Sequence, residues 1–342
     1  MVPRSVGLAP ETGLISLAMN DLRIYVDLPA PPDVLDLLRD GTQGHQLLFP
    51  RTPASSILGA PVHDPQFTAA DIAFGQPDPQ AVAEARRLKW IHVSSSGITR
   101  YDNPLFRSLM AERKIALSNS ASVYNEACAV HVLSFMLAQA RNLPRAFDSR
   151  AANGSAAWHA LRGASSTLRG ETVLIIGFGA IGRRFAELLG PFDMKLIAYR
   201  RKARGNELIP VIAEDQLVPA LQAADHVVNI LPDSAETRHF FDTGRLAAIK
   251  PGAIFYNIGR GTTVNQDALL DALRSGHLKA AWLDVTDPEP LPDNHPLRAQ
   301  PNCFITPHIA GGQTAEAKAL VCHFLQNLQH FVRGEPLLDR VM

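Results

Sequence analysis

Apolar runs rich in β-branched residues alternate with helical patterns along almost the whole chain. Helices are predicted between the first runs, at 32–39 and 79–88, and Pro32 suits a helix start because its missing N–H would be unpaired there. This alternation is typical of a parallel sheet with helices on both faces. The first series of strands is predicted at 22–26, 46–49, 71–74, 90–93 and 115–117.

A second series of the same kind follows a long helical stretch at 125–142, in which apolar residues recur at helical spacing and which ends before Pro144. The segment 151–166 is rich in Ala, Gly and Ser and is predicted to be an irregular connection, with Trp158 as its large anchor. The C-terminal stretch 314–332 is predicted to be helical. The pattern therefore predicts two α/β halves, the second with strands at 172–176, 195–199, 226–230, 253–257, 280–284 and 303–306.

Length and composition narrow the class of protein. The chain has 342 residues, which favours two domains over one. Its 33 basic and 33 acidic residues give no net charge, so no global field attracts nucleic acid or an anionic membrane. No apolar run approaches membrane-spanning length, and the first twenty residues lack the basic region and cleavage site of a signal peptide.

Three cysteines, Cys128, Cys303 and Cys322, lie far apart in the sequence. Their odd number and their spacing argue against a disulfide framework or a metal site. Buried thiols in a reducing compartment are the simplest interpretation, and the expected location is the cytoplasm.

A glycine-rich loop follows the strand predicted at 172–176. It has the form G-x-G-x-x-G and runs into a helical pattern that continues to Leu189. In a dinucleotide site the first glycine permits a tight turn, the second lets the backbone approach a pyrophosphate, and the third lets helix and strand pack closely. The helix N-terminus then attracts the phosphates. A structural turn is the alternative, but the complete strand–turn–helix context favours cofactor contacts at Gly177, Gly179, Ala180, Ile181 and Gly182.

The end of the next strand bears on which cofactor is used. An NAD site usually has Asp or Glu there, about twenty residues after the glycines, to bind the ribose hydroxyls. Arg200 and Arg201 stand here instead, in a basic run that continues to Arg204. Arginine forks suit a 2′-phosphate, so NADP is predicted, with Arg200 and Arg201 as its phosphate ligands. A solvated basic loop is the alternative, and NAD stays possible.

Three short motifs each follow a predicted strand, at 257–261, 284–290 and 306–311. The carboxyl ends of the strands are where ligands bind in open α/β sheets. Each motif alone has a structural explanation as an ordinary polar loop. Together, behind a dinucleotide loop, they fit hydride transfer to the carbonyl of a 2-oxo acid.

Each of three residues in these motifs fits one part of that reaction. His308 is the candidate proton donor for the developing alkoxide, because histidine titrates near neutral pH. Glu289 is the candidate carboxylate that stabilises the imidazolium. Arg260 is permanently charged and bidentate, so it suits the substrate carboxylate. A nicotinamide would supply the hydride, and no metal is needed.

With these motifs, the chain resembles the D-isomer-specific 2-hydroxyacid dehydrogenase family from about residue 22 to residue 332. Arg260, Glu289 and His308 fall on that family's catalytic Arg, Glu and His. The resemblance implies that backbone N–H groups of Ser96 and Gly97 hold the substrate carboxylate. It also implies further cofactor contacts, which are Leu231, Pro232, Thr237, Ile258, Asp284, which faces the nicotinamide, and Gly311.

The resemblance also implies the domain arrangement. Residues 1–124 with 313–342 would form the substrate-binding domain, and 125–312 the dinucleotide-binding domain inserted between them. The expected fold is α/β, with two Rossmann-like doubly wound parallel sheets, an active site in the cleft and the helices at 125–142 and 314–332 as hinges. A homodimer formed mainly through the cofactor domains is implied as well.

The sequence departs from the family pattern in three places. Arg200 replaces the usual acidic residue, Ser95 and Ser96 stand where glycine and a small residue are common, and Val130 stands where an acidic residue is frequent. No functional explanation is evident for Val130.

The favoured function is an NADPH-dependent reductase of the glyoxylate/hydroxypyruvate type that forms a D-2-hydroxy acid. Oxidation of formate or phosphite on the same scaffold would favour an acidic ribose site, which is absent from this stretch of sequence. A nucleotide-sensing protein related to transcriptional co-repressors is the alternative from another class. No extended tail or basic nucleic-acid face supports it.

Overall fold

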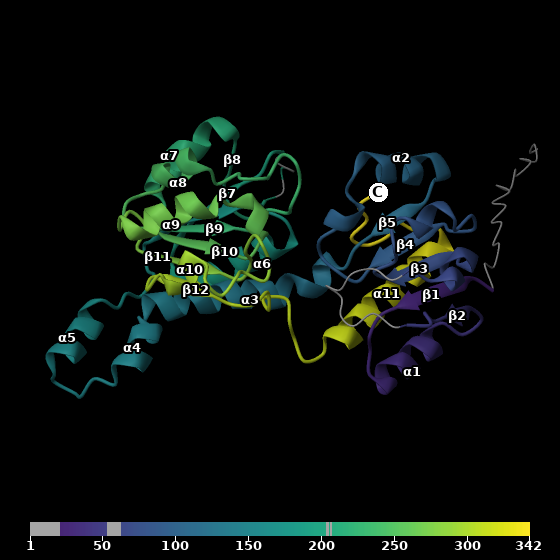
Figure 1. Ribbon diagram of the computed structural model, residues 1–342, viewed down its shortest axis with the longest axis horizontal. Helices are drawn as coiled ribbons and strands as arrows, with labels where there is room; N and C mark the ends of the chain where they lie inside the picture. Colours follow the sequence, from purple (N-terminus) through teal and green to yellow (C-terminus); the bar gives the residue numbers. More distant parts are fainter. Residues whose placement is uncertain (1–20, 53–62, 203–204, 206) are drawn as a thin grey trace, which may run out of the picture.

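The computed structural model describes residues 21–52, 63–202, 205 and 207–342, and it contains two separate parallel sheets (Figure 1). The first has five strands in the order β2-β1-β3-β4-β5, and all its pairings are parallel. Helices α1 (Pro32–Gly41) and α2 (Pro104–Arg113) belong to this half. The strands are β1 (Arg23–Asp27), β2 (Gln46–Leu48), β3 (Ile72–Gly75), β4 (Trp90–Val93) and β5 (Ala116–Ser118).

The second sheet has seven parallel strands in the order β12-β11-β10-β9-β6-β7-β8. Strand β6 pairs with β7 on one side and β9 on the other, so the chain builds outward in one direction and then in the other. Dinucleotides bind at the carboxyl ends of the strands beside such a switch point. The strands are β6 (Thr172–Ile176), β7 (Lys195–Tyr199), β8 (Val211–Ile212), β9 (His226–Asn229), β10 (Ile254–Asn257), β11 (Ala280–Leu283) and β12 (Cys303–Ile305).

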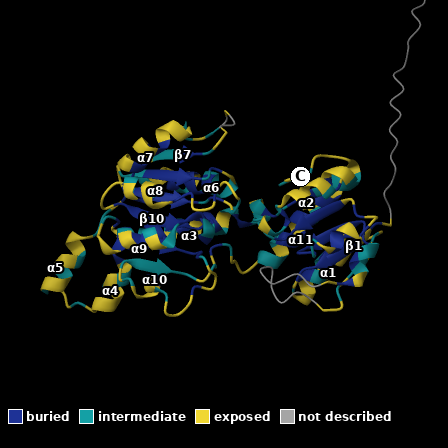
Figure 2. Ribbon diagram, turned by 45° about the horizontal axis from the view of Figure 1, so that its top comes forward, coloured by how far each residue is buried: buried dark blue, intermediate teal, exposed yellow. Residues whose placement is uncertain are grey.

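The second sheet is covered by helices on both sides, so its central strands are buried on both faces (Figure 2). Residues Val173 to Ile176 of β6 are all fully buried, which explains the continuous apolar run of this strand. The helices are α6 (Ala180–Leu189), α7 (Leu217–Ala223), α8 (Thr243–Ala248), α9 (Gln266–Arg274) and α10 (Pro296–Ala299).

The chain passes between the halves twice, along helix α3 (Ala121–Ala140) and along the loop that leads into helix α11 (Glu316–Arg333) (Figure 1). Helix α3 follows β5 of the first sheet and packs along α6 of the second. Helix α11 returns the chain to the first sheet, where the ring of Phe324 stacks on Phe74 at 4.3 Å and on Trp90 at 5.5 Å. The C-terminal helix therefore packs with the first half of the chain, although the domain boundaries at 124/125 and 312/313 stay a prediction.

Every predicted strand is present, and three of them, β4, β6 and β7, have the predicted bounds. The predicted helix at 79–88 is wrong, because only a 3-10 turn, η2 (Ala81–Ala83), forms there. Arg113 explains the difference. Its guanidinium donates to the carbonyl oxygen of Val82 at 2.7 Å, which a continuing α-helix would bond internally, and also to that of Ala85 at 2.5 Å.

The prediction of an irregular connection at 151–166 is also wrong. This segment contains α5 (Ala156–Gly163), which follows α4 (Leu143–Ser149). The Ser155 hydroxyl caps α5 by accepting from the Trp158 backbone N–H at 3.2 Å, and the Ala-rich sequence that follows has a high helix propensity. The two helices form an arm that projects from the end of α3 (Figure 1).

Two expectations drawn from composition can be compared with the structure. Cys128 is buried, but Cys322 is exposed on the outer side of α11, so the prediction of buried thiols is wrong for that residue. Within the described ranges, no helix has the length and apolarity required to cross a membrane. The predicted absence of a signal peptide concerns residues 1–20, which lie outside the described part.

Candidate active site

The glycine-rich loop joins β6 to α6 as its pattern predicts. Gly177 has φ +96°, a left-handed conformation that favours glycine, and its N–H donates to the Tyr199 carbonyl at 3.0 Å. Helix α6 begins at Ala180 with Gly179 as its N-cap, and Ile181 and Gly182 lie in its first turn. A Cβ on Gly182 would lie 2.8 Å from the Gly177 carbonyl oxygen, so the helix packs closely on the turn. The loop thus has the geometry that a dinucleotide pyrophosphate requires.

Arg200 and Arg201 lie directly after β7, at the edge of the same site. Arg201 is exposed, whereas the Arg200 side chain is only 19% exposed. Its Nη1 lies 3.8 Å from Oε1 of Glu207, a carboxylate that the loop after β7 brings back to the strand end. The expectation that no carboxylate lies at this strand end is therefore wrong. Arg204, in the same basic run, lies outside the described residues.

Two buried asparagines hold the loops at the carboxyl ends of β9 and β10. Asn229 Nδ2 donates to Asn257 Oδ1 at 3.0 Å, and Asn229 Oδ1 accepts from the N–H of Leu231 at 3.2 Å. Asn257 Nδ2 donates to the carbonyl of Arg260 at 3.2 Å. Both side chains are almost fully buried, so these bonds fix the loops after β9 and β10, on one side of the switch point.

The predicted cofactor contacts near these asparagines are held in place by burial and by hydrogen bonds within the protein. Leu231 and Ile258 are buried, at 8% and 6% exposure. The Thr237 hydroxyl lies 2.6 Å from the Pro232 carbonyl oxygen and accepts from the Ser234 N–H at 2.9 Å, which closes the turn that follows β9. The structure places these residues at the same edge of the sheet as the glycine-rich loop.

The side chain of Arg260, which follows β10 of the second sheet, extends to the loop after β4 of the first sheet. The backbone of Arg260 runs against the loop after β11, because a Cβ on Gly261 would overlap the Thr286 carbonyl oxygen. That close approach explains the glycine beside this arginine. A Cβ on Gly97, in the predicted substrate loop, would likewise overlap the guanidinium Nη2 of Arg260. The structure therefore brings Arg260 and Gly97 together from opposite halves of the chain.

The predicted substrate loop offers two amides beside that guanidinium. The carbonyl of Ser95 accepts from the N–H of Ser120 at 3.0 Å, and that of Ser96 accepts from Asn119 Nδ2 at 2.7 Å. Because a trans peptide unit is planar, the N–H groups of Ser96 and Gly97 point the opposite way from these carbonyls. Neither N–H donates to another residue of the described chain. With Arg260, they can bind a carboxylate.

His308 and Glu289 form a pair in the loops after β12 and β11. The distance from His308 Nδ1 to Glu289 Oε1 is 2.5 Å, and the side chains are 25% and 37% exposed. When Nδ1 donates to the carboxylate, Nε2 is the ring atom left to exchange a proton with a substrate. His308 itself has φ +53°, so its loop is held in a conformation that side chains rarely adopt.

Asp284 holds that loop in place. Its carboxylate is 2% exposed, with Oδ1 accepting from the Thr306 hydroxyl at 2.6 Å and from the Ile309 N–H at 2.9 Å, and Oδ2 accepting from the Ala310 N–H at 2.9 Å. These bonds constrain the residues on both sides of His308. Contact between Asp284 and a nicotinamide stays a prediction.

Comparison with known proteins agrees with this geometry. Residues 133–310 match the family model described as D-isomer specific 2-hydroxyacid dehydrogenase, NAD binding domain. The chain is 35% identical to the human glyoxylate reductase/hydroxypyruvate reductase over 257 residues, which are 75% of this chain and 77% of that protein. This chain belongs to the D-isomer specific 2-hydroxyacid dehydrogenase family. It is therefore an oxidoreductase with a nicotinamide-dinucleotide-binding domain.

Solved structures share the fold over nearly the whole dehydrogenase chain. A protein from Thermus thermophilus is 29% identical with a TM-score of 0.72, and the match covers 94% of this chain and all of that one. An NADPH-dependent glyoxylate/hydroxypyruvate reductase from Sinorhizobium meliloti, solved with NADP and malonate, is 24% identical with a TM-score of 0.72 over 94% and 96% of the two chains. These likenesses confirm two Rossmann-like parallel-sheet domains.

Several supporting residues of this dehydrogenase were missed from the sequence. Tyr124, Cys128 and His131 lie four and three residues apart on α3, so they share one face of the helix. His131 Nε2 lies 3.6 Å from Asp284 Oδ1. Burial raises the pKa of Cys128 to about 12, and the negative charge of Asp284 adds to the shift while Arg260 opposes it. Polar residues at helical spacing within an apolar helix were the signal that could have identified them.

Proposed function

We propose that this dehydrogenase reduces a small 2-oxo acid of the glyoxylate/hydroxypyruvate type to the D-2-hydroxy acid, with NADPH preferred over NADH. The observation that carries the proposal is the His308–Glu289 pair. It lies at the same edge of the second sheet as Arg260, whose guanidinium extends to the substrate loop of the other half. The human relative is named glyoxylate reductase/hydroxypyruvate reductase, which supports this substrate class. The co-repressor-like alternative has no supporting observation. Oxidation of NADPH on addition of glyoxylate or hydroxypyruvate tests the proposal.

In the proposed mechanism, each residue performs one physical task. The guanidinium of Arg260 and the amides of Ser96 and Gly97 bind the substrate carboxylate. When bound, the nicotinamide supplies a hydride to the carbonyl carbon. His308 donates the proton on Nε2 to the carbonyl oxygen, which would otherwise become an alkoxide. Glu289 accepts the Nδ1–H of the same ring and stabilises its positive charge before the transfer.

The residues around the glycine-rich loop fit a dinucleotide with a 2′-phosphate. The Gly177 turn and the N-terminus of α6 suit the pyrophosphate, and Arg201, exposed at the end of β7, suits the additional phosphate. Glu207 beside Arg200 lowers the local positive charge, so we assign the larger share of NADP selectivity to Arg201.

Replacing Arg201 with alanine should therefore lower kcat/KM for NADPH by about tenfold to a hundredfold and leave kcat/KM for NADH almost unchanged. The size follows from the loss of one or two hydrogen bonds to a charged group. Steady-state kinetics with both cofactors measure it. Lys195→Ala, which removes an exposed charge at the opposite end of the same strand, is the matched control. An equal loss with both cofactors would show that Arg201 does not select for the phosphate.

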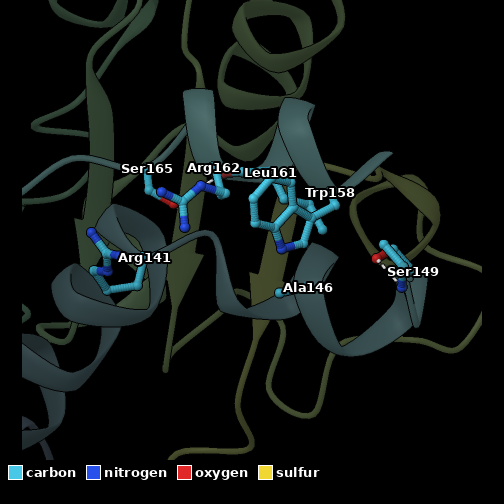
Figure 3. A pocket seen from close by; sticks show the side chains of 8 residues that line it. Arg141, Ala146, Ser149, Trp158, Leu161, Arg162 and Ser165 are labelled. Carbon is cyan, nitrogen blue, oxygen red and sulfur yellow. Dashed lines mark hydrogen bonds between the residues drawn. The ribbon is translucent and has the colours of Figure 1, made fainter. Parts of the chain in front are cut away.

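We also propose that the chain forms a homodimer through its cofactor domain, and that the arm of α4 and α5 takes part. Neither helix contains a buried residue, and Phe147 is 74% exposed. Between the helices, Arg162 lies over the Trp158 ring at 4.6 Å in an open pocket (Figure 3). Helices this short and this exposed are marginal unless another surface covers them.

The arm proposal predicts that the native protein has the mass of two chains and that Phe147→Glu shifts it toward the mass of one. Light scattering coupled to size-exclusion chromatography measures both. Leu105→Glu, at a residue 85% exposed on α2 and away from the arm, is the control and should stay dimeric. A wild-type protein with the mass of a single chain would refute the proposal.

We place the enzyme in the cytoplasm, since its three cysteines are free thiols.

A further inference from the structure

Tyr124 lies in the first turn of α3, where the two halves of the chain meet. Its side chain is 5% exposed. The hydroxyl donates to the Ser94 carbonyl at 2.7 Å and also lies 3.1 Å from Oε1 of Glu316, the first residue of α11. A phenol has one proton, so these two acceptors share it. A single side chain thus contacts both the start of the substrate loop and the start of the C-terminal helix.

On one side, Tyr124 provides one of three hydrogen bonds that hold the substrate loop. The carbonyls of three consecutive residues, Ser94, Ser95 and Ser96, all accept from the segment 119–124. The Tyr124 hydroxyl holds the first of these peptide units. Because each unit is planar, fixing its carbonyl also fixes the direction of the following amide. The phenol therefore fixes the peptide unit that ends in the N–H of Ser95, directly before the two amides, Ser96 and Gly97, that we assign to the substrate carboxylate.

On the other side, the same residue supports the segment that follows His308. The Tyr124 ring lies against Gly311, with Cδ1 2.9 Å from the position of a Cβ on that glycine. Next to it, Gln313 Nε2 donates to the carbonyl of Val123 at 3.1 Å. Asp284 fixes the beginning of this segment, and Tyr124 with Glu316 fixes its end.

We propose that Tyr124 is a positioning residue that sets the carboxylate-binding amides at a fixed distance from the proton-donating ring of His308. This inference rests on the proposed function of the site. The substrate must place its carboxylate on Ser96 and Gly97 and its carbonyl oxygen at His308 together, and the two loops come from different halves of the chain. Tyr124 contacts the substrate loop at Ser94 and the segment after His308 at Gly311, and it need not touch the substrate.

The test removes only the hydroxyl. Tyr124→Phe is compared with Tyr256→Phe, which removes a buried hydroxyl 3.1 Å from His226 Nδ1 within the second sheet. The measurements are KM and kcat for glyoxylate, the dissociation constants of oxalate and of NADPH from tryptophan fluorescence, and the melting temperature. Oxalate is an unreactive dicarboxylate that reports on the carboxylate site without turnover.

In Tyr124→Phe, KM for glyoxylate and the oxalate dissociation constant should both rise about fivefold to tenfold, the effect of one buried hydrogen bond. The NADPH dissociation constant and the melting temperature should match those of Tyr256→Phe. Unchanged oxalate binding in Tyr124→Phe, or an equal loss in both variants, would overturn the inference. If the wild-type enzyme turned over no 2-oxo acid, the proposed function would fail, while oxalate binding would still decide the role of Tyr124.

Discussion

Replacing His308 with asparagine should lower kcat for the 2-oxo acid by about 10² to 10⁴, the range that a positioned general acid contributes. Asparagine is chosen because His308 has φ +53°, and asparagine adopts this left-handed conformation more readily than alanine does. The loop should then keep its shape, and the loss should come from the missing proton donor. Stopped-flow or steady-state oxidation of NADPH measures kcat, and NADPH binding should stay within about twofold of the wild type.

His239→Asn is the matched control for that experiment. His239 is an exposed histidine in the same half of the chain, and its φ of +48° is close to that of His308. The control replaces the same residue type in the same backbone conformation, outside the His308–Glu289 pair. A His308→Asn enzyme that keeps a rate near that of the control would show that the proton comes from another group. His308→Ala would add backbone strain to the loss of the ring, so the alanine and asparagine variants together separate chemistry from folding.

Removing the guanidinium in Arg260→Ala should lower kcat/KM by about a hundredfold or more, mainly through a higher KM for the 2-oxo acid. A bidentate pair with a carboxylate comprises two charge-assisted hydrogen bonds, each worth about 1.5–3 kcal/mol. Arg260→Lys should fall between the wild type and the alanine variant, since lysine keeps the charge but lacks the planar fork. Substrate saturation curves at a fixed NADPH concentration measure the effect.

Arg274→Ala serves as the control for Arg260, because Arg274 is an exposed arginine at the end of α9 in the same half of the chain. Its loss changes the net charge equally without touching the substrate loop. An unchanged KM in Arg260→Ala, with the control also unchanged, would contradict the assignment of Arg260 to the substrate carboxylate.

The parts of this structure that follow from the sequence are those encoded by local patterns. Strand β6 is buried on both faces, so its run of aliphatic residues gives its bounds directly. Gly177 and Gly182 have the backbone requirements that their spacing indicates. Arg260, Glu289 and His308 could be chosen because side chains just after parallel strands gather at one edge of a sheet.

The parts that did not follow depend on contacts between distant residues or on local signals that were overlooked. Tyr124 contacts Glu316, 192 residues away in the sequence, and nothing near Tyr124 indicates this partner. Glu207 reaches Arg200 because a loop turns back, which spacing along the chain does not reveal. Helix α5 was missed for another reason. Its capping residue, Ser155, was present, but the segment around it is rich in Ala, Gly and Ser, a composition that suggested a loop.

The most direct test of the proposed function is a spectrophotometric assay of the purified protein with glyoxylate, hydroxypyruvate, pyruvate and phenylpyruvate, each with NADPH and with NADH. We expect oxidation of NADPH with at least one of these acids, formation of the D-2-hydroxy acid, and a lower kcat/KM with NADH. Oxidation of neither cofactor with any of the four acids would contradict the assignment of Arg260, Glu289 and His308 to 2-oxo acid reduction.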